Sequence, residues 1–293
     1  MKTALTIGLM LALAGLLASS FGAVQVAGGG LASNMAAEAT ASATPALTST
    51  PAPAPVFALI NMPDKSVLSM RAGPGLDYRR VGGVEANMVN LPLTGRIKGT
   101  TPKVWYELRR SGGGTGWITS FYVAEYVAPD VFCQDDRSKA LITNFAKAVN
   151  DSDGQLVASL VSPMHGVTLR LWRDQLALNY LRYAPYLFSS DYPVNWGPPP
   201  GGVKGEVGSL RDAIYPRLKD VFGADYELYC NDASKVSTAF QPWRSEYKNI
   251  NFYTVYKPES QDGKRDWRAW LVGVDYVGGI PYLFSLTNFQ LEP

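Results

Sequence analysis

A short apolar strand that runs into a Gly-Pro-Gly turn constrains the fold of this 293-residue chain more than any other feature. Residues 68–78 read LSMRAGPGLDY, and two further strand-like segments follow, WYEL at 105–108 and GWITSFYV at 116–123. The glycines of the turn can adopt positive φ, whereas Pro74 fixes its own φ, so the turn is rigid. Short strands separated by Gly, Pro and Asn turns predict a small all-β unit over residues 57–127.

The combination of this turn with two Trp-bearing strands resembles the bacterial SH3-like domain, a small β-barrel found in exported proteins. The resemblance covers residues 57–127 and implies docking on cell-wall peptide or glycan. The chain departs from the family's pattern at residues 85–87 (EAN), where Lys-Gly is common, and in its long loop at 98–103, which bears on ligand contacts made by loops. Large aromatic side chains would fill so small a barrel, and four of them are also the candidate ligand-binding residues. These four are Tyr78, Trp105, Trp117 and Tyr122.

The N-terminus has the pattern of an export signal. Lys2 precedes an apolar run at 4–18, and small residues follow, so residues 1–27 are predicted to be a signal peptide. The run is short for a membrane span, which needs about 20 apolar residues, but an uncleaved anchor is the alternative, and only then would a membrane be a partner. Residues 28–56 are rich in Ala, Thr and Pro and predict a disordered linker. We therefore expect an extracytoplasmic protein, secreted or associated with the cell envelope.

The two cysteines, Cys133 and Cys230, both follow the export signal. In an oxidising compartment they predict a disulfide bond, and two separate buried thiols are the alternative. Because the bond would close a loop of 97 residues, the chain-entropy model gives a stabilisation of about 4–5 kcal/mol.

Residues 130–293 predict a second domain of the α+β class, with helices followed by an antiparallel sheet. Apolar residues at 141, 145, 148 and 149 lie on one helix face, and Asp153 is placed to cap a second helix. Strand patterns follow at 167–172, 226–230, 250–256, 269–277 and 280–287. The order of elements is similar to the nuclear transport factor 2-like cone. Separately, residues 162–166, 195–197, 267–276 and 291–293 resemble a C-terminal region of uncharacterised function that follows SH3-like domains in exported bacterial proteins.

The Gly278-Gly279 pair predicts a two-residue hairpin turn and thereby a register. Val277 would face Ile280, Asp275 would face Tyr282, and Gly273 would face Phe284. Asp275 then lies on the more apolar face, together with Leu271, Val277, Ile280, Tyr282, Phe284 and Leu286. A carboxylate there has a raised pKa unless it is paired. Asp275 is therefore either a catalytic acid or, as we expect, a structural residue paired with Arg170 or Arg268 and with the Tyr282 hydroxyl.

His165 is the only histidine, which excludes multi-histidine zinc sites and Cys-His-His peptidases. A Ser-His-Asp triad needs one histidine, but the chain has no Gly-x-Ser-x-Gly motif. We expect His165 to be a structural, hydrogen-bonded residue, and we predict neither a metal nor a cofactor.

These observations favour a non-enzymatic, exported envelope protein with a C-terminal binding or interaction module. The first alternative is a wall glycan hydrolase that uses Asp275 with Glu206 or Asp191, for which two carboxylates must lie about 5–10 Å apart across a cleft. The second is a structural scaffold without wall affinity. A net charge of +2 without a Lys/Arg cluster argues against nucleic acid. Aromatic residues are dense after Tyr180 and would either fill the core or stack on sugars or peptides.

Overall fold

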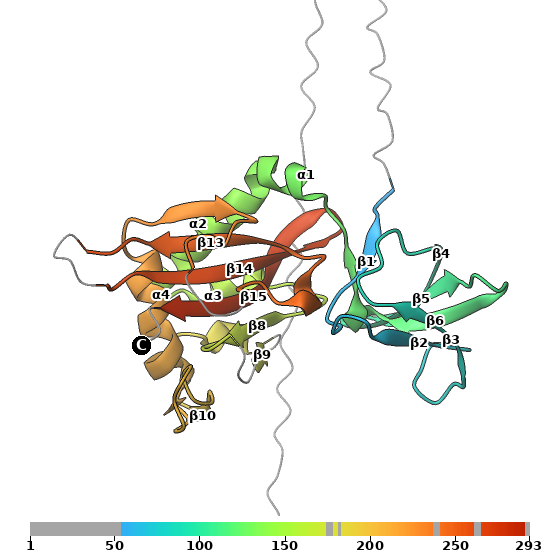
Figure 1. The fold of residues 1–293 in the computed structure, drawn as a ribbon, viewed down its shortest axis with the longest axis horizontal. Coiled ribbons are helices and arrows are strands. Elements are labelled where there is room, and N and C mark those ends of the chain that lie inside the picture. The colour runs from blue at the N-terminus through green and yellow to red at the C-terminus, as the bar shows by residue number, and fades with distance from the viewer. Residues whose placement is uncertain (1–53, 174–177, 181–182, 237–240, 261–264, 291–293) are drawn as a thin grey trace, which may run out of the picture. The chain divides into compact units, whose positions relative to one another are not determined.

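Most strands of the protein belong to two sheets, which are seen in Figure 1. The computed structural model describes residues 54–173, 178–180, 183–236, 241–260 and 265–290. The predicted signal peptide and nearly all of the predicted linker lie outside these ranges. The described chain is mostly β with a few helices, which confirms an α+β mixture in coarse terms.

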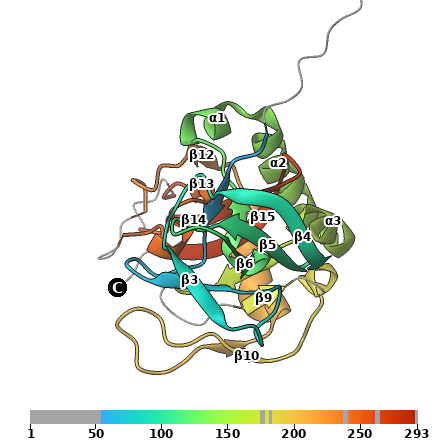
Figure 2. The same cartoon turned by 90° about the vertical axis from the view of Figure 1, so that its right-hand side faces the viewer.

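The first sheet contains five antiparallel strands in the order β3-β2-β6-β5-β4, and Figure 2 looks towards it. The strands are β2 (Val67–Arg71), β3 (Arg80–Glu85), β4 (Leu93–Thr100), β5 (Lys103–Arg109) and β6 (Thr115–Thr119). A separate pair joins β1 (Phe57–Leu59) to β7 (Val123–Glu125), after a 3-10 turn at Ser120–Tyr122. We call residues 57–127 the N-terminal region.

The predicted closure of this region into a barrel is not seen. Strands β3 and β4 remain edge strands, and no sheet closes on itself within the described ranges. The pairing of β2 with β6 is limited to Arg71 and Trp117, and the register of β4 shifts between Leu93 and Ile97. A small apolar cluster nevertheless fills the region: Leu59, Met62, Met70, Val84, Leu91, Leu108, Ile118 and Val123.

Four α-helices follow in the described chain, and their ends agree with the capping signals in the sequence. Asp135 caps α2 by accepting from the Arg137 N–H, and Asp153 caps α3 by accepting from the Leu156 N–H. A π-helical turn at Leu210–Ile214 leads into α4, which carries Pro216 in its first turn. The helices are α1 (Pro129–Gln134), α2 (Asp136–Asp151), α3 (Gly154–Leu160) and α4 (Tyr215–Phe222).

The second sheet has six strands in the order β12-β13-β14-β15-β8-β9. They are β12 (Glu227–Cys230), β13 (Asn251–Lys257), β14 (Arg268–Val277), β15 (Ile280–Gln290), β8 (Val167–Arg170) and β9 (Leu178–Tyr180). This sheet is mixed, whereas the sequence predicted a purely antiparallel one, because β8 pairs parallel with β15. A parallel pair needs a long connection, and more than a hundred residues separate these two strands.

The hairpin turn and part of its register agree with the prediction. Gly278 and Gly279 both have positive φ, Val277 pairs with Ile280, and Asp275 pairs with Tyr282. The predicted pairing of Gly273 with Phe284 is wrong, because a bulge adds one residue to β15 and Gly273 pairs with Ser285. Since one extra residue reverses the side-chain alternation, Leu286 lies on the opposite face from the one predicted.

Both faces of the second sheet are covered. Helices α2, α3 and α4 lie on one side (Figure 1), where Trp270, Val272 and Val274 belong to the largest apolar cluster. On the other side, Phe284 packs in a cluster with Ile60 and Ala124 of the N-terminal region. The described residues from Ala54 onward belong to one compact unit. The division into domains at 57–127 and 130–293 therefore stays a prediction.

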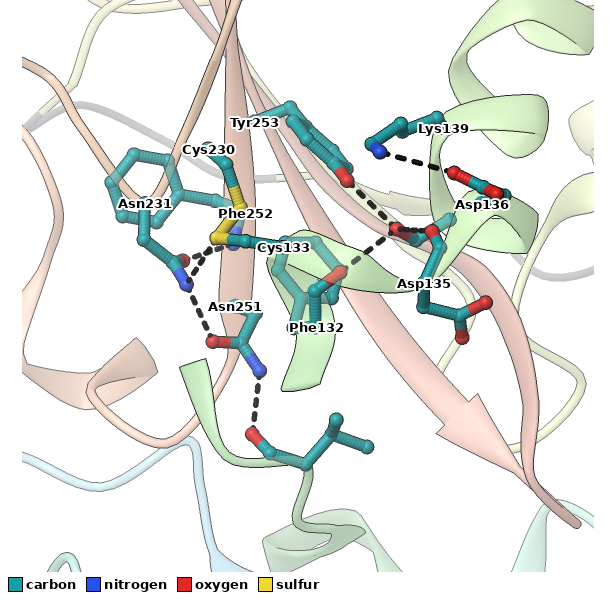
Figure 3. Close-up of a disulfide and its surroundings, with 12 residues drawn as sticks. Phe132, Cys133, Asp135, Asp136, Lys139, Cys230, Asn231, Asn251, Phe252 and Tyr253 are labelled. Atoms are coloured by element: carbon teal, nitrogen blue, oxygen red, sulfur yellow. Dashed lines mark hydrogen bonds and ion pairs between the residues drawn. A yellow bond between two sulfur atoms is a disulfide. The ribbon is translucent and has the colours of Figure 1, made fainter. Parts of the chain in front are cut away.

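Polar contacts add to this packing between the regions. The Glu125 carboxylate accepts from the N–H groups of Gly278 (2.6 Å) and Gly279 (2.8 Å), which ties β7 to the hairpin turn. Asn249 Nδ2 donates to the Leu59 carbonyl at 2.9 Å, and Asn251 Nδ2 donates to the Val127 carbonyl at 2.7 Å. The second bond is drawn in Figure 3.

The predicted disulfide bond is confirmed. Cys133 at the end of α1 is bonded to Cys230 at the end of β12, with Cα atoms 5.7 Å apart (Figure 3). Asn231 Nδ2 lies beside it and donates to Asn251 Oδ1 at 2.8 Å. The bond joins the first helix to an edge strand of the second sheet.

Candidate functional site

A groove around Trp105 is the main hollow on the N-terminal region. Two adjoining cavities, of about 400 and 720 Å³, share Leu76, Trp105 and Thr119 in their walls. Arg71 and Tyr122 line the first cavity, and Lys103, Phe121 and His165 line the second. We call the two cavities together the Trp105 groove.

The Gly-Pro-Gly turn builds one wall of this groove. A Cβ atom on Gly73 would lie 2.4 Å from the Tyr78 ring, so the ring packs directly on the turn backbone. Arg71 Nη1 donates to the Tyr78 carbonyl at 3.1 Å and closes the loop. Leu76 at its tip is 72% exposed and lines the groove.

The structure separates the four predicted ligand-binding aromatic residues. Trp105 and Tyr122 come together in the groove wall. Tyr78 supports the turn and lines neither groove cavity. Trp117 is buried, and Arg96 lies 5.6 Å from its ring centroid, so Trp117 belongs to the packing of the region.

A third cavity, of about 350 Å³, continues the groove towards the second sheet. It shares Phe121 and His165 with the Trp105 groove. Its charged wall contains Arg170 and Arg244, which both contact Glu246 Oε1, at 3.4 and 2.5 Å respectively. No sequence pattern predicts this arrangement, because Arg170 lies 76 positions from Glu246 along the chain.

A buried histidine–aspartate pair lies behind the groove. His165 Nδ1 is 2.6 Å from Asp275 Oδ2, and its Nε2 is 3.0 Å from the Ser120 carbonyl oxygen. Because a carbonyl can only accept, Nε2 carries a proton. Burial alone would lower the pKa of His165, but the Asp275 carboxylate outweighs it and raises this pKa. Both ring nitrogens of His165 therefore have hydrogen-bond partners, and Asp275 favours the imidazolium form, which confirms that His165 is hydrogen-bonded.

Ser162 completes the surroundings of Asp275. Its hydroxyl donates to Asp275 Oδ2 at 2.6 Å and accepts from the backbone N–H of His165 at 3.0 Å. The predicted partners of Asp275 are wrong, because His165 and Ser162 take the place of an arginine and Tyr282. The signal for them was local: residues 162–166 (SPMHG) form a turn that brings Ser162 and His165 together.

Ser162, His165 and Asp275 do not form a nucleophilic triad. In such a triad the serine hydroxyl donates to histidine Nε2, and the aspartate binds Nδ1. Here the Ser162 hydroxyl binds the aspartate instead, and Nε2 faces the Ser120 carbonyl. Nothing in this arrangement would deprotonate the serine.

The other two candidate carboxylates lie in different surroundings. Glu206 pairs with Arg217 of α4 at 3.0 Å, whereas Asp191 is exposed in the wall of a tyrosine-lined cavity. Neither lines the Trp105 groove, and Asp275 is buried behind it. Among the described residues, no three His, Cys, Asp or Glu side chains form a group that could hold a metal ion.

Comparisons with known proteins add no assignment: no protein family, no curated protein and no solved structure matches the chain. None of the helices within the described ranges is long and apolar enough to cross a membrane.

Proposed function

We propose that the protein is an exported cell-envelope binding protein that docks on cell-wall peptide or glycan through the Trp105 groove. The observation that carries this proposal is the groove itself. It offers exposed apolar surface at Leu76, a half-buried Trp105 ring, and the cations Arg71 and Lys103. Open aromatic-lined hollows with a few polar groups are the usual form of ligand sites.

Four features of the chain support this reading. The N-terminal sequence has an export pattern, and the Cys133–Cys230 bond suits an oxidising compartment. The residues that resemble the bacterial SH3-like domain, around the Gly-Pro-Gly turn and Trp105, are those that build the groove. The cationic side chains would attract the carboxylates of wall peptides.

The test is sedimentation of the mature chain with purified cell-wall sacculi, before and after an amidase has removed their peptides. We expect Trp105→Ala to lower the bound fraction at least tenfold, since aromatic anchors carry much of a binding energy. Trp105→Phe should keep part of the binding. Leu228→Ala, at an exposed site on β12, is the control that should bind like the wild type. Equal binding by wild type and Trp105→Ala would contradict the proposal.

A scaffold without wall affinity is the second candidate, and one observation favours it. The N-terminal region shares an apolar cluster with the second sheet, where Ile60 and Ala124 pack with Phe284. A domain whose purpose is to pack on its neighbour would show such contacts. This reading predicts that the folded wild-type chain does not sediment with any sacculi.

The hydrolase alternative has no such observation behind it. It needs two carboxylates facing each other across a cleft. Asp275 is held by His165 and Ser162, Glu206 by Arg217, and Asp191 lies in the wall of a different cavity.

A further inference from the structure

Three exposed tyrosine side chains surround a cavity that the proposed function does not use. The cavity lies in residues 130–290, which we call the C-terminal region. Tyr183, Tyr186 and Tyr192 are 63%, 57% and 74% exposed, and all three line a cavity of about 680 Å³. Large aromatic rings gathered at a surface mark interaction sites. The cavity shares no described wall residue with the Trp105 groove.

The backbone beneath these rings is firmly held. Tyr183 precedes and Tyr186 ends a 3-10 turn (Ala184–Tyr186) that contains Pro185, and the Ser190 N–H donates to the Tyr186 carbonyl at 2.9 Å. The turn packs closely on α3, because a Cβ on Gly154 would lie within 2 Å of the Pro185 carbonyl oxygen. Ala184 beneath it is buried in the main core. A rigid platform loses little entropy when a ligand binds.

The far side of the cavity is anchored as well. Leu210, which is buried, opens the helical segment and lines the cavity together with half-buried Val194. Val194 pairs with Gly208 in a short ladder, and the buried Trp196 donates from Nε1 to the Gly208 carbonyl at 3.0 Å. The cavity is therefore held by the core on both sides.

The polar groups of the wall define the ligand. Asp191 and the hydroxyls of Ser189 and Ser190 offer acceptors and donors between the rings, and the described wall has no basic side chain. An anionic ligand is thus disfavoured. Each of the three tyrosines is more than half exposed, so they form open platforms rather than the tight cage that encloses a small cation.

We propose that this cavity binds a neutral saccharide of several units. Electron-rich ring faces attract the polarised C–H faces of sugar rings, and the Asp191 carboxylate accepts their hydroxyl protons. Tyr192, the most exposed ring, provides the outermost platform. The site is independent of the Trp105 groove.

The test is calorimetric titration of the full mature chain with two soluble probes, the β-1,4-linked tetrasaccharides of N-acetylglucosamine and of glucose. We expect at least one to bind. Tyr192→Ala and Asp191→Ala should each weaken that binding about tenfold. Tyr192→Phe keeps the ring and should bind within about threefold of the wild type. Both side chains are exposed, so melting temperatures should stay unchanged and show that the variants fold.

Two controls separate this site from the proposed function. Tyr78→Ala removes a tyrosine elsewhere that is 49% exposed, and Trp105→Ala removes the groove anchor. Both should leave the Tyr192-dependent part of tetrasaccharide binding unchanged, even if sacculus binding fails. The proposal is overturned if neither tetrasaccharide binds, or if Tyr192→Ala binds as tightly as the wild type. It is also overturned if only tetramethylammonium, or only a Pro-Ala repeat peptide, binds in a Tyr192-dependent way.

Discussion

The N-terminal region and the C-terminal region differ in how much apolar surface they bury. The N-terminal region has a small core around Leu59 and Ile118, and it leaves Leu76 and Phe121 more than half exposed. The C-terminal region buries rings as large as Trp196 and Trp270 completely and adds a disulfide bond. Small units bury a smaller share of their surface. We infer that the first region supplies the surface that docks on the cell wall, and that the second region, which also holds the proposed saccharide cavity, supplies most of the stability.

The regions also differ in how they hold a buried carboxylate. Burial alone would raise the pKa of Glu107, but hydrogen bonds from Thr94 and Thr115 and the charge of Arg96 outweigh it and lower this pKa. Asp275 is instead held by a histidine, which can lose its charge near neutral pH. The stabilisation that depends on Glu107 should therefore be lost as the pH falls, whereas the stabilisation that depends on His165 should be lost as the pH rises.

Loss of the disulfide should have the largest effect on stability. Removing a cross-link that closes 97 residues costs about 4–5 kcal/mol in the chain-entropy model. For a chain of this size, that lowers the melting temperature by about 8–20 °C. Thermal unfolding of the Cys133→Ala/Cys230→Ala variant measures the loss. A reductant should lower the wild-type melting temperature and leave the variant unchanged; a variant as stable as the oxidised wild type would refute the assignment of stability to this bond.

Asp275→Asn should have the second largest effect, about 3 kcal/mol, because it leaves the buried His165 cation without its anion. Denaturant unfolding at pH 6 measures the change. Asp191→Asn, the same substitution at an exposed carboxylate, should change stability by less than about 0.5 kcal/mol. Equal stabilities for the two variants would show that the His165–Asp275 pair contributes nothing.

The same pair predicts a pH dependence with a definite sign. The pKa of His165 is raised in the folded state, so its contribution is complete below the unfolded value of about 6.5 and is lost as the pH rises through the folded pKa. Unfolding free energies measured between pH 5 and 9 should fall with pH in the wild type. His165→Gln should flatten this slope. An unchanged slope would mean that another group causes the pH dependence.

Local patterns in the sequence predicted much of this structure, whereas contacts between residues far apart in the chain could not be predicted from such patterns. The Asp153 cap and the Gly278-Gly279 turn depend on near neighbours in the chain, and the disulfide bond follows from the presence of two cysteines. The turn sets the pairing of β14 with β15 only near the hairpin, so it does not predict the bulge at Phe284 further along β15.

The candidate site shows the same limit. Trp105 and Tyr122 were identified from their motif, and both line the groove. The contact between His165 and the Ser120 carbonyl joins residues 45 positions apart. Only the folded arrangement of the two regions reveals it.

Glu107→Gln should have the smallest stability effect, about 1–2 kcal/mol, because the neutral amide keeps some hydrogen bonds but loses the ion pair with Arg96. The lowered pKa of Glu107 gives stability that is present above its unfolded pKa and is lost as the pH falls through the folded pKa. Unfolding at pH 7 and pH 3 should show a gap between wild type and variant that closes in acid. Glu85→Gln, at an exposed site on β3, should leave no gap at either pH, and a constant gap for Glu107→Gln would contradict the ionic origin.

The central claim is that the N-terminal region docks on sacculi and the C-terminal region supplies most of the stability. It is tested most directly by measuring sacculus binding and melting temperature on the same preparations of Trp105→Ala and Asp275→Asn. We predict that Trp105→Ala loses at least tenfold in binding and melts within a few degrees of the wild type. Asp275→Asn should melt clearly lower and, below its melting temperature, bind sacculi like the wild type. Full binding by Trp105→Ala, or lost binding by folded Asp275→Asn, would contradict the account.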